Sequence, residues 1–320
     1  MGWAKLIITV AMLASGRAVP PAVVRADDVE QDKAIAAIVA IGGKAEQIEG
    51  GIKVDLSNNR NAEAALVHLP ALKAVRWVDL RTSHITDVGL ARLAGLKELQ
   101  SLDLLNARIT DAGLAHLAGL NDLRSLRFEF VGISDDGLIH LVGLKSLRLL
   151  DLTGTKVTDD GLALLTGLNS LDSLYLNGTK VTDVGMAQIA KFKQLRSLKL
   201  NATKVTNAGL ARLAGLTELR SLSLGGTGVT DDGLARLAGL TELQFLDLQN
   251  TQITDKGLNQ VAGFKKINSL YLHGTEVTDV GLARLGGLKE LRLLTLSNTG
   301  VTDEGVRQLK KSLPEVQINY

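Results

Sequence analysis

The chain has 320 residues, contains no cysteine and carries a formal net charge of +2. The absence of cysteine excludes disulfide bonds, thiolate catalysis and zinc sites with cysteine ligands. Removal of an N-terminal segment with Lys5, Arg17 and Arg25 would bring the net charge to about −1, so neither nucleic acid nor an anionic membrane surface is favoured as a partner.

Residues 1–26 are typical of a signal peptide. Lys5 precedes an apolar run from Leu6 to Ala14, which is too short to span a bilayer but fits the core of a secretory signal. Small residues around Ala26 offer a cleavage point. We therefore expect a secreted, periplasmic or cell-surface protein whose mature chain has no integral membrane insertion. A disordered or membrane-retained N-terminus is the alternative.

Residues 27–51 are expected to form an N-terminal cap. Ile35 and Ile38 belong to one apolar helical face that ends at Gly42, and the stretch around Gly50 predicts a hairpin. The end repeats of a stacked array need such a cover over their exposed leucines.

Residues 52–320 hold about eleven copies of one 24-residue phrase and a short C-terminal cap. The copy that begins at Leu102 reads LDLLNARITDAGLAHLAGLNDLR. Alternation around Leu102 and Leu104 predicts a short strand with one buried face. Leu114 and Leu117 are three residues apart, which predicts a short helix. Each copy is therefore a strand, a turn, a helix and a return loop.

Self-similarity at this period predicts a solenoid, because one unit cannot bury its leucines alone. The strands of neighbouring copies join into one parallel sheet. Strands lie about 4.8 Å apart, whereas packed helices need about 10 Å, so the stack bends with its sheet inside. The expected fold is an α/β horseshoe with a concave parallel sheet and short convex helices.

Two polar columns recur in the turns of the phrase. A hydroxyl at the position of Thr155 is expected to bond the backbone of its turn. Thr110 or Asp111 is expected to cap the helix that follows, and Gly119 to end that helix in the left-handed conformation. One copy departs from the pattern near Val131, which leaves the geometry of that turn open.

The Asp column also raises the possibility of calcium. Each Asp belongs to a different repeat, however, and Ca²⁺ needs six to eight oxygens that converge on one point. We therefore favour helix capping and expect no metal and no cofactor.

The consensus LxxLxLxxT-x-[IV]-T-D-x-G-L resembles leucine-rich repeats over about 260 residues. It is most similar to the cysteine-containing, ribonuclease-inhibitor-like class, with Thr where Cys or Asn usually stands. The cysteine-free chain and its signal-like start resemble bacterial secreted members. The resemblance implies that a ligand is captured on the concave face.

Strand residues that point away from the leucines are expected to face that hollow. Aromatic residues make up only 3% of the chain, yet several fall in these columns, and exposed aromatics often anchor interfaces. The predicted partner-binding residues are Trp77, Tyr175, Phe245, Asp247, Gln249, Tyr271, His273 and Leu293. We expect one patch around Phe245 and Tyr271 and another around Trp77, Leu105 and Leu149. Alternatively, these are scattered surface residues, or Trp77 and Leu293 pack against the caps.

Six arginines share the position at which each strand begins. They are expected to pair with nearby glutamates and form a solvated edge, and binding of phosphate or sulfated glycan is the alternative. The arginines are Arg76, Arg124, Arg148, Arg196, Arg220 and Arg292, and the expected partners are Glu98, Glu218 and Glu290.

The pattern favours a non-enzymatic module that binds a protein ligand, since no Ser-His-Asp or paired-carboxylate arrangement stands out from the repeated Asp residues. One alternative is a structural or adhesive cell-surface component that binds glycan or its own copies. The other is a cytoplasmic substrate adaptor of a ubiquitin ligase, against which the signal-like N-terminus argues.

Overall fold

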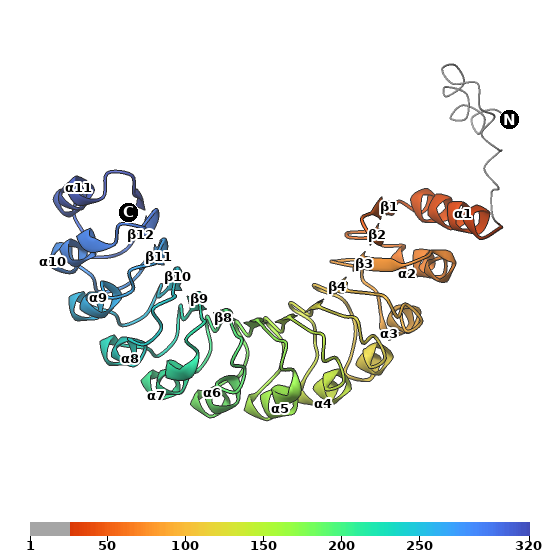
Figure 1. Ribbon diagram of the computed structural model, residues 1–320, viewed down its shortest axis with the longest axis horizontal. Helices are drawn as coiled ribbons and strands as arrows, with labels where there is room; N and C mark the ends of the chain where they lie inside the picture. Colours follow the sequence, from red (N-terminus) through yellow and green to blue (C-terminus); the bar gives the residue numbers. More distant parts are fainter. Residues whose placement is uncertain (1–25) are drawn as a thin grey trace, which may run out of the picture.

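The computed structural model describes residues 26–320, which form an open arc. Strands line the concave side of the arc and helices follow the convex side (Figure 1). Helix α1 (Ala26–Ala40) lies at one end and helix α11 (Asp303–Ser312) at the other. The predicted α/β horseshoe is confirmed. The signal peptide predicted for residues 1–26 lies outside the described residues, apart from Ala26.

One sheet of thirteen strands runs through the described chain in sequence order. Strands β1 and β2 pair antiparallel as a hairpin closed at Gly50, and the later pairs are parallel. Repeat strands pair at the spacing of the phrase, with Leu150 opposite Leu174. The strands are β1 Lys44–Ile48, β2 Gly51–Asp55, β3 Val75–Asp79, β4 Ser101–Asp103, β5 Ser125–Arg127, β6 Leu149–Asp151, β7 Ser173–Tyr175, β8 Ser197–Lys199, β9 Ser221–Ser223, β10 Phe245–Asp247, β11 Ser269–Tyr271, β12 Leu293–Thr295 and β13 Gln317–Asn319.

The convex side consists of short α-helices and 3₁₀ turns, because each copy leaves room for only one or two helical turns. The α-helices between the two ends are α2 Ala62–Leu66, α3 Asp87–Ala91, α4 Asp135–Leu138, α5 Asp159–Leu164, α6 Asp183–Ile189, α7 Asn207–Leu210, α8 Asp231–Ala235, α9 Asp255–Val261 and α10 Asp279–Leu282. The 3₁₀ segments are η1 Leu69–Ala71, η2 Ala112–Leu117, η3 Ile139–Leu141, η4 Leu165–Gly167, η5 Ala211–Gly215 and η6 Ala283–Gly287.

A single core runs the length of the arc between sheet and helices. The central leucine of each repeat strand, such as Leu126, Leu150 or Leu174, is 0% exposed. Burial of one such side chain contributes roughly 1.5–3 kcal/mol, and every copy supplies several. The array therefore needs neither disulfides nor many aromatics to stay folded.

The ladder threonines act as predicted. Thr155 is 4% exposed, and its hydroxyl donates to the Leu152 carbonyl at 2.7 Å. The same bond recurs at Thr179, where the hydroxyl donates to the Leu176 carbonyl at 2.7 Å. These bonds satisfy carbonyls that the turn leaves without a sheet partner.

The Asp column does not cap its own helices, so that part of the capping prediction is wrong. Asp159 instead reaches the next copy, where its carboxylate accepts the Thr182 N–H at 2.9 Å and the Thr182 hydroxyl at 2.6 Å. The Thr182 oxygen in turn accepts the Val184 N–H at 3.2 Å and so caps α6, as predicted for the threonines. A Cβ on Gly185 would overlap the Asp159 carboxylate, which explains the glycine column. The Asp residues from Asp87 to Asp279 therefore each fasten two repeats together.

The left-handed position of the phrase lies before the ladder threonine and not at Gly119. Gly119 is absent from the left-handed residues of the described chain, and Ala118 keeps φ at −54° because η2 ends as a tight 3₁₀ turn. Gly119 instead leaves room for Lys97, whose ammonium group donates to the Gly119 carbonyl at 3.4 Å. The left-handed column is Asn58, Thr82, Asn106, Phe130, Gly154, Gly178, Ala202, Gly226, Asn250, Gly274 and Asn298.

The irregular copy keeps this turn. Val131 is 1% exposed in the place of the ladder threonine, and its N–H donates to the Phe128 carbonyl at 3.0 Å. Phe130 adopts φ +56° with its side chain 61% exposed, and its ring lies against Gly154. The sequence change near Val131 thus alters side chains and leaves the backbone turn intact.

We expect Phe130→Asn to leave the free energy of unfolding unchanged or to raise it by up to about 1 kcal/mol, because Asn tolerates the left-handed region better than Phe. The matched control Phe128→Ala should lower it by about 3–5 kcal/mol, since Phe128 is 0% exposed. Urea unfolding followed by circular dichroism measures both. A loss above about 1 kcal/mol in Phe130→Asn would show that the ring stabilises the turn more than the conformation strains it.

Candidate functional site

The strand residues that flank each buried leucine face the hollow of the arc. In β10, Leu246 is 0% exposed, whereas Phe245 on the opposite face is half-buried. The same alternation in β3 buries Val78 and leaves Trp77 38% exposed. All eight predicted partner-binding residues therefore lie on the concave side, but they fall into separate groups.

One group forms at the C-terminal part of the sheet. The rings of Phe245 and Tyr271 have centroids 5.1 Å apart and an interplanar angle of 42°. Strand register places Phe245 and Leu293 on either side of Ser269, and Thr295 beside Tyr271. We call Phe245, Tyr271, Leu293 and Thr295 the aromatic patch.

A polar atom inside the aromatic patch lacks a partner. The Thr295 hydroxyl oxygen is buried and forms no hydrogen bond with the described chain. A buried hydroxyl left unpaired costs about 1–3 kcal/mol, and such groups are uncommon in native proteins. The patch thus combines two aromatic rings with a hydroxyl that is unpaired and closed to solvent.

Asp247 lies beside the patch but contributes almost no surface. It is 6% exposed, because Asn201 reaches across β9 and donates to its carboxylate at 2.9 Å, while the Gln249 N–H donates at 3.1 Å. Gly225 makes this reach possible, since a Cβ there would crowd Gln249 and Asn201. Burial raises the pKa of Asp247 above its ordinary value, with the hydrogen bonds acting in the opposite direction. Asp247 therefore belongs to a polar floor rather than to a contact surface, whereas Gln249 is half-buried and keeps its place among the predicted contact residues.

The other predicted residues lie apart from the patch or at its margin. His273 follows Tyr271 by two residues and is half-buried. Tyr175 belongs to β7, which two strands separate from β10, and the Lys199 ammonium group lies 4.2 Å from the centre of its ring. That cation–π contact already occupies one face of Tyr175. Trp77 belongs to β3 at the other end of the arc.

Trp77 borders a hollow that sequence reasoning missed. A cavity of about 560 Å³ lies on strands β2 to β5, and a second, more open one of about 480 Å³ adjoins it beside Ile48 and Glu49 of the β1–β2 hairpin. Both are lined by Lys53 and Trp77, and we call them together the Trp77 hollow. The available signal was the column of charged side chains on consecutive strands, in which Asp79 aligns with Asp103 and Asp103 with Arg127.

Ion pairs occupy the floor of the Trp77 hollow. The Arg81 guanidinium donates to Asp79 at 2.6 Å, and the Arg127 guanidinium donates to Asp103 at 3.4 Å. Burial raises the pKa of Asp103, although the Leu105 N–H and Arg127 act in the opposite direction. Both carboxylates are therefore already engaged by cations of the chain itself.

The arginine edge is paired only in part. Arg76 forms the predicted pair with Glu98 at 3.1 Å. Arg196 likewise pairs with Glu218 at 3.2 Å. Arg292 donates to backbone carbonyls instead of its predicted glutamate, because its guanidinium folds back onto its own return loop. Exposed pairs of this kind contribute little to stability, so the edge is mainly a solvated surface.

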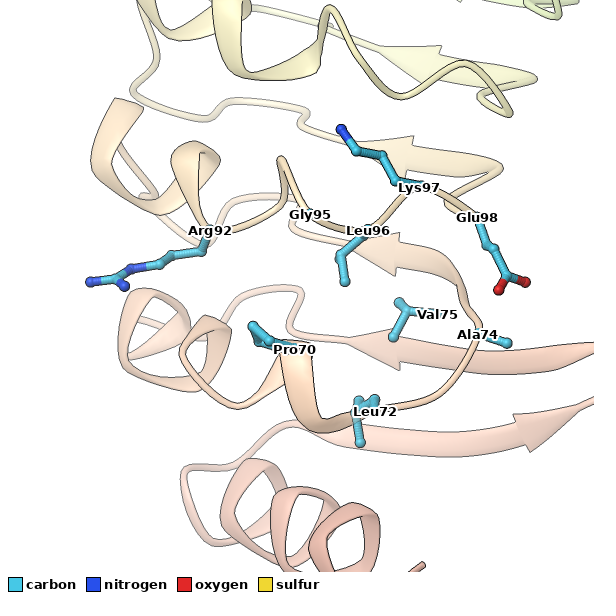
Figure 2. Close-up of a pocket in the computed structure, with 9 residues that line it drawn as sticks. All are labelled: Pro70, Leu72, Ala74, Val75, Arg92, Gly95, Leu96, Lys97 and Glu98. Carbon is cyan, nitrogen blue, oxygen red and sulfur yellow. The ribbon is translucent and has the colours of Figure 1, made fainter. Parts of the chain in front are cut away.

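A smaller cleft of about 290 Å³ lies between the first two return loops, away from the concave face. Figure 2 shows Leu72, Val75 and Leu96 forming its floor, whereas the charged ends of Lys97 and Glu98 point away from it. Lys97 and Glu98 also have partners of their own. The cleft lacks the convergent polar groups of a ligand site.

Residues 26–320 contain no group of three or more His, Asp or Glu side chains placed to hold a metal ion. Within the same residues, no helix combines the length and the apolar character needed to cross a membrane.

Comparison with known proteins points to one repeat family. A family model described as Leucine Rich repeat matches residues 143–165, 216–238 and 240–260. Among solved structures, an internalin (inlF) from Listeria monocytogenes is 23% identical over 84% of this chain and 86% of its own, with a TM-score of 0.51. An internalin C2 (inlC2) from the same species is 27% identical over 65% of this chain and 84% of its own, with a TM-score of 0.50. No curated protein matches significantly.

Proposed function

Because the chain is a leucine-rich-repeat protein, we propose that it is a non-enzymatic module that binds a protein partner on its concave sheet, outside the cytoplasm. The observation that carries this proposal is the aromatic patch, where the rings of Phe245 and Tyr271 lie together on the concave side of the sheet, opposite the buried leucines. Aromatic pairs in such positions are typical anchors of protein interfaces.

The dimensions of the concave face fit a protein ligand. The twelve mutually parallel strands from β2 to β13, about 4.8 Å apart, give a surface of roughly 50 Å, which is long enough for a standard protein footprint. The signal-like residues 1–26 support an exported location. At the arginine edge, a hollow of about 390 Å³ brings Arg148 and Arg196 together with Asp172 and Glu218. Those two carboxylates repel a sulfated glycan, so a protein partner is favoured.

We expect Phe245→Ala combined with Tyr271→Ala to weaken partner binding by at least about thirtyfold, because interface anchors contribute 2 kcal/mol or more each. The full chain and the double variant are used to capture proteins from exported and cytoplasmic fractions, and quantitative mass spectrometry compares the recovered proteins. Affinity for each captured protein is then measured with the purified pair.

Tyr175→Ala is the matched control, since it removes a concave aromatic outside the aromatic patch and should leave binding unchanged. Equal recovery of every specific protein by the wild-type chain and the double variant would exclude the patch as the anchor. Specific partners found only in the cytoplasmic fraction would contradict the exported location.

A further inference from the structure

The larger cavity of the Trp77 hollow has an excess of positive charge, because its lining holds four cations and two carboxylates. Glu49 lines the smaller cavity. Asp79 and Asp103 are each engaged by an arginine, as described above. Lys53 and Arg124 also line the hollow, and neither forms an ion pair with a carboxylate of residues 26–320. Two cations therefore remain available at opposite sides of the cavity, on β2 and at the start of β5.

The apolar component of the hollow is equally well defined. Trp77 is 38% exposed between Lys53 of the neighbouring strand and Ser101 of the next. Beyond it, Ile48 of the hairpin contributes a second apolar wall to the smaller cavity. Tryptophan is the residue type most enriched among interface anchors, and its exposure here is not explained by the core.

The wall formed by the hairpin is held in place. The Arg76 guanidinium donates to the Gly50 carbonyl at the hairpin turn and also pairs with Glu98. Five residue pairs join β1 to β2, from Lys44 opposite Asp55 to Ile48 opposite Gly51. A preformed wall reduces the ordering cost of binding, so the cavity is suited to a ligand without further rearrangement.

We propose that the Trp77 hollow binds an extended acidic peptide segment of a partner protein, with a large apolar side chain of that segment packed against Trp77. The acidic groups would pair with Lys53 and Arg124, and the apolar side chain would fill the smaller cavity beside Ile48. This assignment rests on the proposed protein-binding function and names the chemistry of a second contact on the same face.

The floor of the hollow favours a peptide over a sulfated glycan or another polyanion. Asp79 and Asp103 lie among the cations, and their carboxylates repel a ligand that carries negative charge at every unit. A peptide with spaced acidic residues avoids this repulsion, and its backbone N–H groups can donate hydrogen bonds to the carboxylates. An apolar ring beside isolated cations also matches an alternation of acidic and apolar side chains.

A random linear peptide library displayed on phage provides the first test, with the immobilised full chain as bait. We expect enrichment of sequences in which Asp or Glu flank a large apolar residue. The same selection on Trp77→Ala and on Lys53→Glu combined with Arg124→Glu should lose this motif. Enrichment without an acidic bias, an identical motif on the variants, or no enrichment at all would each overturn the proposal.

Fluorescence titration of one selected peptide provides the second test. The chain has two tryptophans, so a full-length Trp3→Phe protein leaves Trp77 as the single reporter. We expect saturable changes in its emission, and at least about tenfold weaker binding after the double charge reversal or at high salt. Arg236→Glu, on the convex side after α8, is the matched charge control and should bind normally. A heparin oligosaccharide that binds more tightly than the peptide would assign the hollow to glycan instead.

The two proposals fail in different ways. The double variant of the aromatic patch should still bind the selected peptide, because that patch is seven strands away from β3. Loss of peptide binding in that variant would place the peptide at the patch and overturn the assignment to the Trp77 hollow. In another outcome, peptide binding depends on Trp77, but the double variant Phe245→Ala/Tyr271→Ala captures the same proteins as the wild-type chain. That result would overturn only the aromatic patch as the anchor of the proposed function.

Discussion

Leu150→Ala is expected to lower the free energy of unfolding by about 3 kcal/mol, because it deletes a fully buried side chain from the core. Leu150 is 0% exposed at the centre of β6, with Leu126 and Leu174 opposite it on the neighbouring strands. Removing its side chain leaves a cavity between three repeats that cannot close without moving the sheet. Urea unfolding followed by circular dichroism measures the loss as a shift of the midpoint.

The adjacent residue provides a control with the same chemistry. Leu149 belongs to the same strand, faces the concave side and is only half-buried, with Ser125 and Ser173 opposite it. Leu149→Ala should therefore change the free energy of unfolding by less than about 1 kcal/mol. Equal losses in the two variants, or a larger loss for Leu149, would contradict the register that places every concave residue discussed above.

Asp159→Ala is expected to cost about 1–3 kcal/mol, although Asp159 lies near the surface of a helical turn. Its carboxylate holds both the N–H and the hydroxyl of Thr182 in the next copy. Without it the Thr182 N–H has no partner in its repeat, and the cap of α6 is released from its neighbour. The same urea titration measures the effect, and amide hydrogen exchange at Val184 reports the loosened helix start.

The chain contains its own precedent for a conservative replacement. Asn207 occupies the place of the Asp, where its amide oxygen accepts the Thr230 N–H at 2.9 Å and its nitrogen donates to the Thr230 hydroxyl at 2.8 Å. Asp159→Asn should therefore retain most of the stability that Asp159→Ala loses. If the Asn variant were as unstable as the Ala variant, the negative charge and not the bond geometry would hold the repeats together.

These bridges have a counterpart at both ends of the array. Glu63 of the first copy accepts hydrogen bonds from the N–H and the hydroxyl of Thr86. Asp279 accepts the same two hydrogen bonds from Thr302 near the end of the array. The hydrogen bonds favour the ionised form and hold the pKa of both carboxyls below the ordinary range. In α2, the first of the short helices on the convex side, the longer side chain of Glu63 thus makes the contact that Asp makes in later copies.

The alternation of strand residues predicted which side chains lie on the concave face, but not which of them stay exposed there. The strand period placed Phe245 and Tyr271 on the concave face, because a residue beside a buried leucine must point the other way. The period said nothing about how much of each side chain stays exposed. Asp247 was expected at the surface and is covered, since Asn201 crosses β9 from a copy 46 residues away.

The sequence by itself determined the solenoid, its parallel sheet, the face on which each strand residue lies and the buried role of the ladder threonines. These features depend on contacts within one copy or between identical neighbours, which a fixed period encodes directly. The tertiary structure alone decided the bridges between Asp and Thr of successive copies, the unpaired Thr295 hydroxyl and the Trp77 hollow. Curvature and stacking bring those groups together across different repeats, so their distances depend on the shape of the arc and not on the pattern of any one copy.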